Sequence, residues 1–216
     1  MFINRVDAGL QLADNLLIYK NTDAVILALP KGGVPIAYTV ALELNLKLDL
    51  VLTKKIGHPS NREYAIGSVS PRNVYINEIH KDISKTYLES EVERLKKELN
   101  EKYLTYTEHI EPVDFKNKTI IIVDDGIATG HTMIGTIDLV KMGKPKKIVV
   151  AIPVGPKEAI EKIKRMVDEI ICLEIPENFV GVGQFYENFE QVSDDEVIRL
   201  LKKINKKESL KASALE

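Results

Sequence analysis

Two adjacent carboxylates, Asp124 and Asp125, stand directly before a stretch of small and hydroxyl-bearing residues. Neighbouring carboxylates can hold the two hydroxyls of a vicinal diol, or orient a Mg²⁺ ion, which prefers oxygen ligands. The hydroxyls of Thr129 and Thr132 can donate hydrogen bonds to an anion, and the glycines between them and the acids let the backbone approach anion oxygens closely. This combination predicts a site that holds a sugar phosphate by its diol at one end and by its phosphate at the other.

The residues on either side of the carboxylates predict the elements that position them. Residues 120–123 are four β-branched residues, a pattern typical of a strand buried on both faces of a parallel sheet. Beyond the small-residue turn, Met133, Ile137 and Val140 recur at helical spacing, and Gly143 ends the pattern. A helix N-terminus presents unpaired N–H groups and a partial positive charge, which suits a phosphate. The predicted order is therefore strand, acidic pair, loop and helix N-terminus.

A second candidate loop follows an earlier apolar run, residues 24–29. It contains Lys31, Gly32 and Gly33, and it precedes a predicted helix that Pro35 can open without losing a hydrogen bond. The spacing is not that of a Walker A motif. Because ligands of open α/β sheets bind outside the carboxyl ends of the strands, this loop is a candidate for anion binding by backbone N–H groups and a lysine.

A polar stretch follows the next predicted strand, residues 48–53. It begins with Lys54 and Lys55 and continues to residue 73 without a regular apolar pattern. We therefore expect residues 54–73 to form a long irregular loop, and loops of this length in compact domains are usually functional or mobile. A short strand is expected at residues 74–77.

A long helix is predicted over residues 84–107, because apolar residues recur there at coiled-coil-like spacing. The stripe consists of Leu88, Val92, Leu95 and Leu99. It predicts packing either on the domain itself or on the second subunit of a homodimer.

Strands and helices alternate along the chain, which favours a single α/β domain with a parallel sheet. Further strands are predicted at residues 147–152 and 169–174, and further helices at residues 7–18, 157–167 and 194–204. We assign residues 1–204 to this domain and the polar residues 205–216 to a flexible tail.

The overall composition is that of an ordinary globular protein, with 216 residues, of which 44% are hydrophobic and 29% charged. The net charge of −2 argues against recruitment of nucleic acid or an anionic membrane by a global field. No apolar run approaches the roughly 20 residues of a membrane span, and no signal-peptide pattern is recognised at the N-terminus. Cys172 is the only cysteine, so no disulfide can form within the chain, which fits a cytoplasmic location.

Residues 120–132 closely resemble the phosphoribosyl pyrophosphate (PRPP) signature of type I phosphoribosyltransferases. That signature is four apolar residues, two acids, a small and apolar stretch, and Thr-Gly-x-Thr. The resemblance implies an α/β fold with a parallel core sheet flanked by helices, at about residues 24–170, and a small hood at about residues 171–192. It implies PRPP binding by Asp124, Asp125, Gly126, Ala128, Thr129, Gly130, His131 and Thr132, with Asp124 and Asp125 as catalytic residues and as the acids beside Mg²⁺.

The same resemblance extends to the other loops. The loop after the first strand is similar to the family's pyrophosphate loop, which implies that Lys31, Gly32 and Gly33 bind pyrophosphate. Lys54 and Lys55 stand where the family places basic residues that contact pyrophosphate. Lys54 is therefore an expected catalytic residue, and residues 54–70 are an expected lid that closes over PRPP.

The stretch around Phe179 resembles the hood of the 6-oxopurine enzymes, where an aromatic ring stacks on the base and the next backbone group reads its edge. Phe179 and Val180 are therefore the expected base-binding residues. The chain departs from that subfamily at two positions. Tyr186 stands where a metal-holding Asp is expected, and Ala128 stands where an Asp serves the base, as it does in adenine and orotate enzymes.

The resemblance implies an enzyme of nucleotide metabolism that transfers phosphoribosyl from Mg²⁺-PRPP to a nitrogenous base or similar acceptor and releases pyrophosphate. A PRPP- or nucleotide-sensing regulator on the same fold is a second interpretation, because fold and ligand loop do not fix function. A relative of PRPP synthetase is a third, which the lack of room for a duplicated domain disfavours. The sequence does not identify the acceptor.

Overall fold

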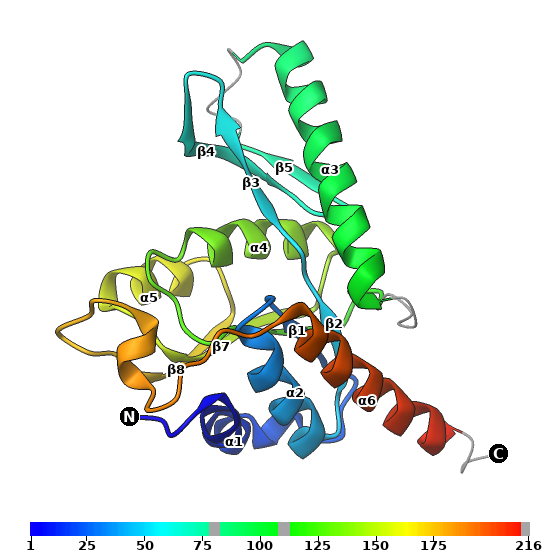
Figure 1. The fold of residues 1–216 in the computed structure, drawn as a ribbon, viewed down its shortest axis with the longest axis vertical. Coiled ribbons are helices and arrows are strands. Elements are labelled where there is room, and N and C mark those ends of the chain that lie inside the picture. The colour runs from blue at the N-terminus through cyan, green and yellow to red at the C-terminus, as the bar shows by residue number, and fades with distance from the viewer. Residues whose placement is uncertain (78–82, 108–112, 213–216) are drawn as a thin grey trace.

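The computed structural model describes residues 1–77, 83–107 and 113–212. Its body is a five-stranded parallel sheet in the order β2-β1-β6-β7-β8 (Figure 1). The strands are β1 (Val25–Ala28), β2 (Lys47–Leu50), β6 (Thr119–Val123), β7 (Lys147–Val154) and β8 (Glu169–Glu174). The predicted α/β fold with a parallel core sheet is therefore confirmed.

Helices cover both faces of this sheet. The first face is covered by α1 (Arg5–Asn15), α2 (Gly33–Leu44) and α6 (Asp194–Ala212), and the second by α4 (His131–Met142) and α5 (Lys157–Lys164). Among the described residues, the 3₁₀ helix η1 (Leu17–Tyr19) follows α1, and the 3₁₀ helix η3 (Val182–Phe185) lies in the predicted hood. Because successive strand residues point to opposite faces, Ile121 and Val123 pack in the cluster beneath α1 and α2, whereas Ile120 and Ile122 pack in the cluster beneath α4 and α5.

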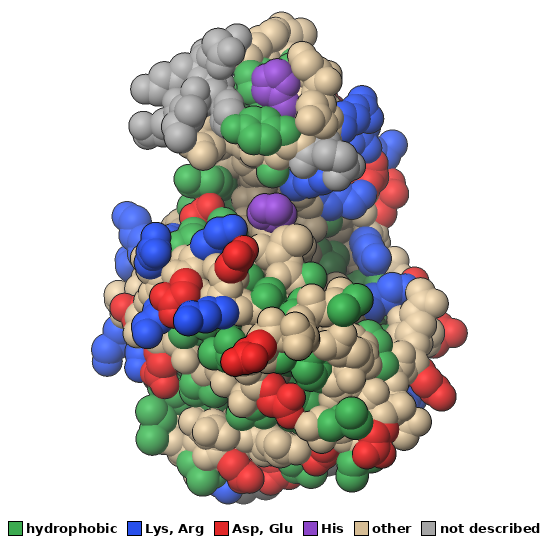
Figure 2. Space-filling view, turned by 90° about the vertical axis from the view of Figure 1, so that its left-hand side faces the viewer, with side chains coloured by type: hydrophobic (Ala, Val, Ile, Leu, Met, Phe, Trp, Pro, Cys, Tyr) green, Lys and Arg blue, Asp and Glu red, His purple; other side chains and the backbone are tan. Residues whose placement is uncertain are grey.

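An arm projects from this body (Figure 1). It consists of an antiparallel sheet of β3 (Lys54–His58), β4 (Asn61–Val69) and β5 (Val74–Ile76), together with α3 (Lys85–Thr107). Figure 2 shows the face that is the left-hand side of Figure 1. Basic and acidic side chains both lie on this face.

The expectation of an irregular loop over residues 54–73 was wrong. The strand pattern is hidden because the register of β3 against β4 shifts on both sides of Gly57. Gly57 and Gly67 also lie so close to neighbouring backbone that a Cβ atom would come within 2.5 Å and 2.2 Å of carbonyl oxygens. Glycine and polar residues thus occupy many strand positions. Among the described residues of β3 and β4, the buried apolar side chains are Ile56, Ile66 and Val69.

The long helix and the short strand that precedes it were predicted correctly. Leu95 and Leu99 of α3 are buried in the cluster that α1 and α2 cover, and Leu88 and Val92 pack against it. The apolar stripe of α3 therefore packs on the chain's own core. The last helix extends to Ala212 instead of ending near residue 204, and residues 213–216 of the predicted tail lie outside the described residues.

Within the described part of the chain, no helix is long and apolar enough to cross a membrane.

Candidate active site

The carboxyl ends of β1 and β6 lie at the point where the order of the strands reverses. The chain leaves β1 for β2 on one flank and later returns to β6 on the other. Such a switch point is where open α/β sheets bind ligands. The loop of Lys31, Gly32 and Gly33 after β1 and the acidic pair after β6 are therefore brought together at the expected place.

The two loops pack against each other more closely than any residue but glycine would allow. A Cβ atom on Gly32 would lie 1.9 Å from Oδ2 of Asp125, and one on Gly33 would lie 2.7 Å from the carbonyl oxygen of Val123. The backbone N–H of Leu29 also donates to that carbonyl, at 3.0 Å. The glycines thus let the predicted pyrophosphate loop lie directly on the acidic pair.

The acidic pair lies in a largely dehydrated environment. Burial and the neighbouring charge of Asp125 hold the pKa of Asp124 well above its ordinary value. Burial also raises the pKa of Asp125, and the hydrogen bonds and charge of Arg5 offset part of that rise. A cation or a set of hydroxyl donors would favour the ionised pair, which suits the predicted ribose and Mg²⁺ contacts.

The loop after the acids has the geometry of an anion site. Gly126 and Gly130 have φ angles of 148° and 77°, which favour glycine, and Gly130 caps α4 without any side-chain hydrogen bond. Thr129, His131 and Thr132 are exposed at this end of α4. The first N–H groups of α4 are therefore accompanied by exposed hydroxyl and imidazole groups, which suits a bound phosphate.

Two of the three predicted pyrophosphate lysines, Lys31 and Lys54, pair with carboxylates. The Lys31 Nζ atom lies 3.4 Å from Oδ1 of Asp194, which also accepts a hydrogen bond from Tyr106. Lys54 pairs with Glu98 of α3, and Lys55 is exposed on β3. Lys54 and Lys55 thus begin the arm, and their contact with pyrophosphate stays a prediction.

Two residues of the predicted hood contact the acidic pair or the glycine after it, and the sequence interpretation assigned neither of them a binding role. The Tyr186 hydroxyl donates to the carbonyl oxygen of Asp125 at 2.7 Å, and the Val182 side chain covers Gly126. Tyr186, at the position where the 6-oxopurine pattern has an Asp, thus anchors the acid loop. Phe179 stacks on Phe185, with ring centroids 5.7 Å apart, whereas the Val180 residue is 94% exposed.

Arg5 is a further site residue that the sequence interpretation missed. Its Nε and Nη2 atoms lie 3.0 and 2.8 Å from Oδ2 of Asp125. No local motif marks it, because it stands 120 residues before its partner.

The predicted Mg²⁺ ligands fit a shared site. Within the described residues, no group of three or more His, Cys, Asp or Glu side chains could hold a metal alone. Magnesium is commonly bound by one or two carboxylates together with substrate phosphates and water. Asp124 and Asp125 suit that arrangement.

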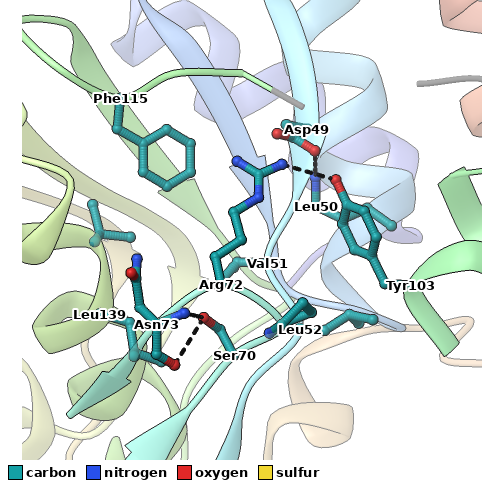
Figure 3. Close-up of a pocket in the computed structure, with 12 residues that line it drawn as sticks. Asp49, Leu50, Val51, Leu52, Ser70, Arg72, Asn73, Tyr103, Phe115 and Leu139 are labelled. Atoms are coloured by element: carbon teal, nitrogen blue, oxygen red, sulfur yellow. Dashed lines mark hydrogen bonds between the residues drawn. The ribbon is translucent and has the colours of Figure 1, made fainter. Parts of the chain in front are cut away.

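A separate pocket lies at the base of the arm (Figure 3). Its walls come from β2, the β4–β5 turn, α3 and α4, and the Arg72 side chain points into it between Phe115 and Tyr103. Arg72 donates to the Tyr103 hydroxyl and to the carbonyl oxygen of Val113. None of the predicted site residues lines this pocket, so it is distinct from the candidate active site.

A family model described as the phosphoribosyl transferase domain matches residues 6–190. The chain belongs to this family. The matched residues include all strands of both sheets and both loops of the candidate site, whereas Arg5 and α6 lie outside the match.

Similar proteins agree with this assignment. The crystal structure of TT1426 from Thermus thermophilus is 34% identical, with a TM-score of 0.86 over 93% of this chain and 97% of that chain. A Mycobacterium tuberculosis protein, Rv0571c, provisionally named a phosphoribosyl transferase, is 35% identical over 93% of this chain. The alignment covers 46% of that protein, so the chain spans about half the length of this curated relative.

A segment of this chain is also similar to a ribose-phosphate pyrophosphokinase of Thermococcus kodakarensis. The two are 42% identical over 64 residues, which is 29% of this chain and 23% of that protein. The likeness therefore covers a segment and not the whole fold.

Proposed function

We propose that this domain transfers the phosphoribosyl group of PRPP to a nitrogen nucleophile and releases pyrophosphate. The contact between Gly32 and the Asp125 carboxylate carries the proposal, because it joins the predicted pyrophosphate loop to the predicted ribose-binding acids. PRPP carries its pyrophosphate on C1 of the ribose and its diol on the two carbons that follow, so it matches this juxtaposition.

In the proposed reaction the bond between C1 and the pyrophosphate oxygen breaks, and a bond from C1 to the acceptor nitrogen forms with inversion. The proton of the acceptor nitrogen passes to solvent or to the departing pyrophosphate. Asp124 and Asp125 hold the ribose hydroxyls and stabilise the positive charge that develops on the sugar. The N–H groups at the start of α4, with Thr129 and Thr132, hold the 5-phosphate.

The leaving group is received on the other side of the acids. The backbone of the Lys31–Gly33 loop and the Lys31 ammonium group bind pyrophosphate, with Lys54 as a further cation. Asp124 and Asp125 would hold Mg²⁺ together with PRPP, and the metal ion would supply positive charge that offsets the charge on the departing pyrophosphate. Positioning of PRPP and charge stabilisation account for most of the proposed rate enhancement.

The second candidate function is a PRPP- or nucleotide-sensing protein. The ion pairs of Lys31 with Asp194 and of Lys54 with Glu98 favour it, because both cations already have carboxylate partners. An enzyme and a sensor would both bind PRPP, and only the enzyme would turn it over.

The decisive experiment is a PRPP-dependent assay of pyrophosphate release with Mg²⁺ and a panel of purine and pyrimidine bases. Catalytic release with one acceptor supports the transferase. Tight PRPP binding in titration calorimetry without release from any acceptor favours the sensor, and absence of PRPP binding overturns the transferase and the PRPP sensor.

A further inference from the structure

We propose that Arg5 is a positioning residue that divides the work of the acidic pair. It anchors Asp125 to the N-terminal helix and leaves Asp124 as the carboxylate that makes the stronger contacts with the ribose hydroxyls and the metal ion. This inference rests on the proposed function and assigns unequal roles to two acids that the sequence pattern treats alike.

Three groups hold the Arg5 guanidinium in place. Nε and Nη2 both donate to Oδ2 of Asp125, and Nη1 donates to the carbonyl oxygen of Glu190 at 2.7 Å. The Phe189 ring lies beneath it, with its centroid 3.9 Å from Cζ. The Arg5 side chain is 11% exposed and the Asp125 side chain 16% exposed, so the pair is well shielded from water.

The backbone that carries Arg5 is itself fixed. Asn4 caps α1 by accepting hydrogen bonds from the N–H groups of Val6 and Asp7. Phe2 is buried and pairs with the hood, donating to the carbonyl oxygen of Phe185 and accepting from the N–H of Glu187. A guanidinium on such an anchored segment costs little additional ordering when it fixes a carboxylate.

Asp125 is restrained from other directions as well. Gly32 lies against the same Oδ2 atom, and the Tyr186 hydroxyl binds the Asp125 carbonyl oxygen. By contrast, Asp124 has no ion pair with a cation among the described residues; its Oδ1 accepts from the backbone N–H of Asp125 at 2.8 Å and lies beside Gly33. The carboxylate of Asp124 thus keeps more of its capacity for a ligand.

The alternation of β6 explains why Arg5 takes Asp125 and not Asp124. Ile121 and Val123 face the side that α1 covers, and Ile122 faces the side that α4 covers. Continuing this alternation past the strand end places Asp125 on the α1 side. Asp124 instead lies beside the start of α2, where a Cβ atom on Gly33 would come 3.1 Å from its Oδ1. One acid therefore meets the N-terminal helix, and the other does not.

The test measures PRPP affinity by titration calorimetry in the presence of Mg²⁺. The proteins compared are wild type, Arg5→Met, Arg5→Lys, Asp124→Asn, Asp125→Asn and the Arg5→Met/Asp125→Asn double variant.

Arg5→Met keeps an apolar stem and removes the guanidinium. It should bind PRPP about tenfold more weakly, the scale of one charge-assisted hydrogen bond, and Arg5→Lys should restore part of the loss. Arg5→Met should add little in the Asp125→Asn background, because the partner is already altered. Asp124→Asn should weaken binding more than Asp125→Asn.

Lys147→Met is the matched control. It removes a more exposed ion pair, with Glu169, at the first residues of β7 and β8 and so at the opposite end of the strands from the candidate site. It should lower stability in urea without changing PRPP affinity.

Two results would overturn the role of Arg5 alone: wild-type PRPP affinity in a folded Arg5→Met variant, or an equal loss from Arg5→Met with and without Asp125→Asn. Equal losses from Asp124→Asn and Asp125→Asn would overturn the division of roles. If Arg5→Met does not fold, Arg5→Lys and the Asp124→Asn and Asp125→Asn comparison still decide the matter. A wild-type protein that binds no PRPP would overturn the proposed function and this inference together.

Discussion

Oδ2 of Asp125 occupies the space that a side chain at Gly32 would need, since a Cβ atom there would lie 1.9 Å from it. Gly32→Ala should therefore force the two loops apart, lowering the free energy of unfolding by about 1–3 kcal/mol, as overpacking does, and weakening PRPP binding. Urea unfolding and calorimetry measure both effects. Gly181→Ala is the stability control, because a Cβ atom at Gly181 meets nothing within 4 Å. Equal stability of the two variants would contradict the close contact.

Asp124→Asn and Asp125→Asn should each weaken PRPP binding and turnover while the protein stays folded. Each change removes the charge from one hydrogen-bonding carboxylate, which is worth about 1.5–3 kcal/mol. Calorimetric titration with PRPP and Mg²⁺ checks the affinity, and circular dichroism checks the fold. Unchanged affinity in both variants would remove the acids from the site.

Phe179→Ala should reduce affinity for an aromatic acceptor by about 1–3 kcal/mol, the range measured for stacking of a base on an aromatic ring. Phe179 now stacks on Phe185, so an acceptor would extend an existing aromatic pair. The KM for the acceptor found in the pyrophosphate-release assay is the measurement. Val180→Ala is a suitable control, because the exposed Val180 side chain is expected to contribute only its backbone. An unaffected Phe179→Ala variant would separate the hood from acceptor binding.

Hypoxanthine and guanine should be poor acceptors or none at all, despite normal PRPP binding. The position that carries an Asp in the resembling 6-oxopurine enzymes is Ala128 here, and the position of their metal-holding Asp is Tyr186. The initial rate of pyrophosphate release with each base is the observable. Robust turnover of hypoxanthine by the wild-type protein would show that Ala128 does not exclude 6-oxopurines.

The ion pair of Lys147 with Glu169 should give stability that depends on pH. Hydrogen bonds from Lys147 and Tyr19 hold the pKa of Glu169 below its ordinary value of 4.5. The contribution is therefore fully present above pH 4.5 and is lost as the pH falls through the lower pKa of the folded state. Urea unfolding of wild type and Lys147→Met on both sides of that pH tests this. A stability gap that widens in acid would contradict the assignment.

The parts of the fold and site that could be predicted from the sequence are those that depend on residues close together in the chain. The run of residues 120–123 predicted β6, and the alternation of elements predicted the parallel sheet. The sequence of Asp124, Asp125 and the turn after them predicted a loop that leads into α4, because strand, turn and helix signals are local.

The parts that were missed depend on contacts between distant residues or on interrupted patterns. The β3–β4 hairpin was interpreted as a loop because register shifts around Gly57 break its alternation. Arg5 reaches Asp125 only after the whole sheet is assembled. The end of α6 was placed too early because its last residues are polar, although Lys, Glu, Leu and Ala all favour helix.

One helix touches both the phosphate end of the candidate site and the arm. The α4 helix starts at His131, and at Gly135, about one turn further on, its carbonyl oxygen accepts a hydrogen bond from Ser68 of β4 at 3.0 Å. The chain contains no Trp, and Tyr64 of β4 is 53% exposed. A Tyr64→Trp variant would therefore carry a single indole on the arm, and its fluorescence would report whether an event at the start of α4 is transmitted through this helix to the hairpin.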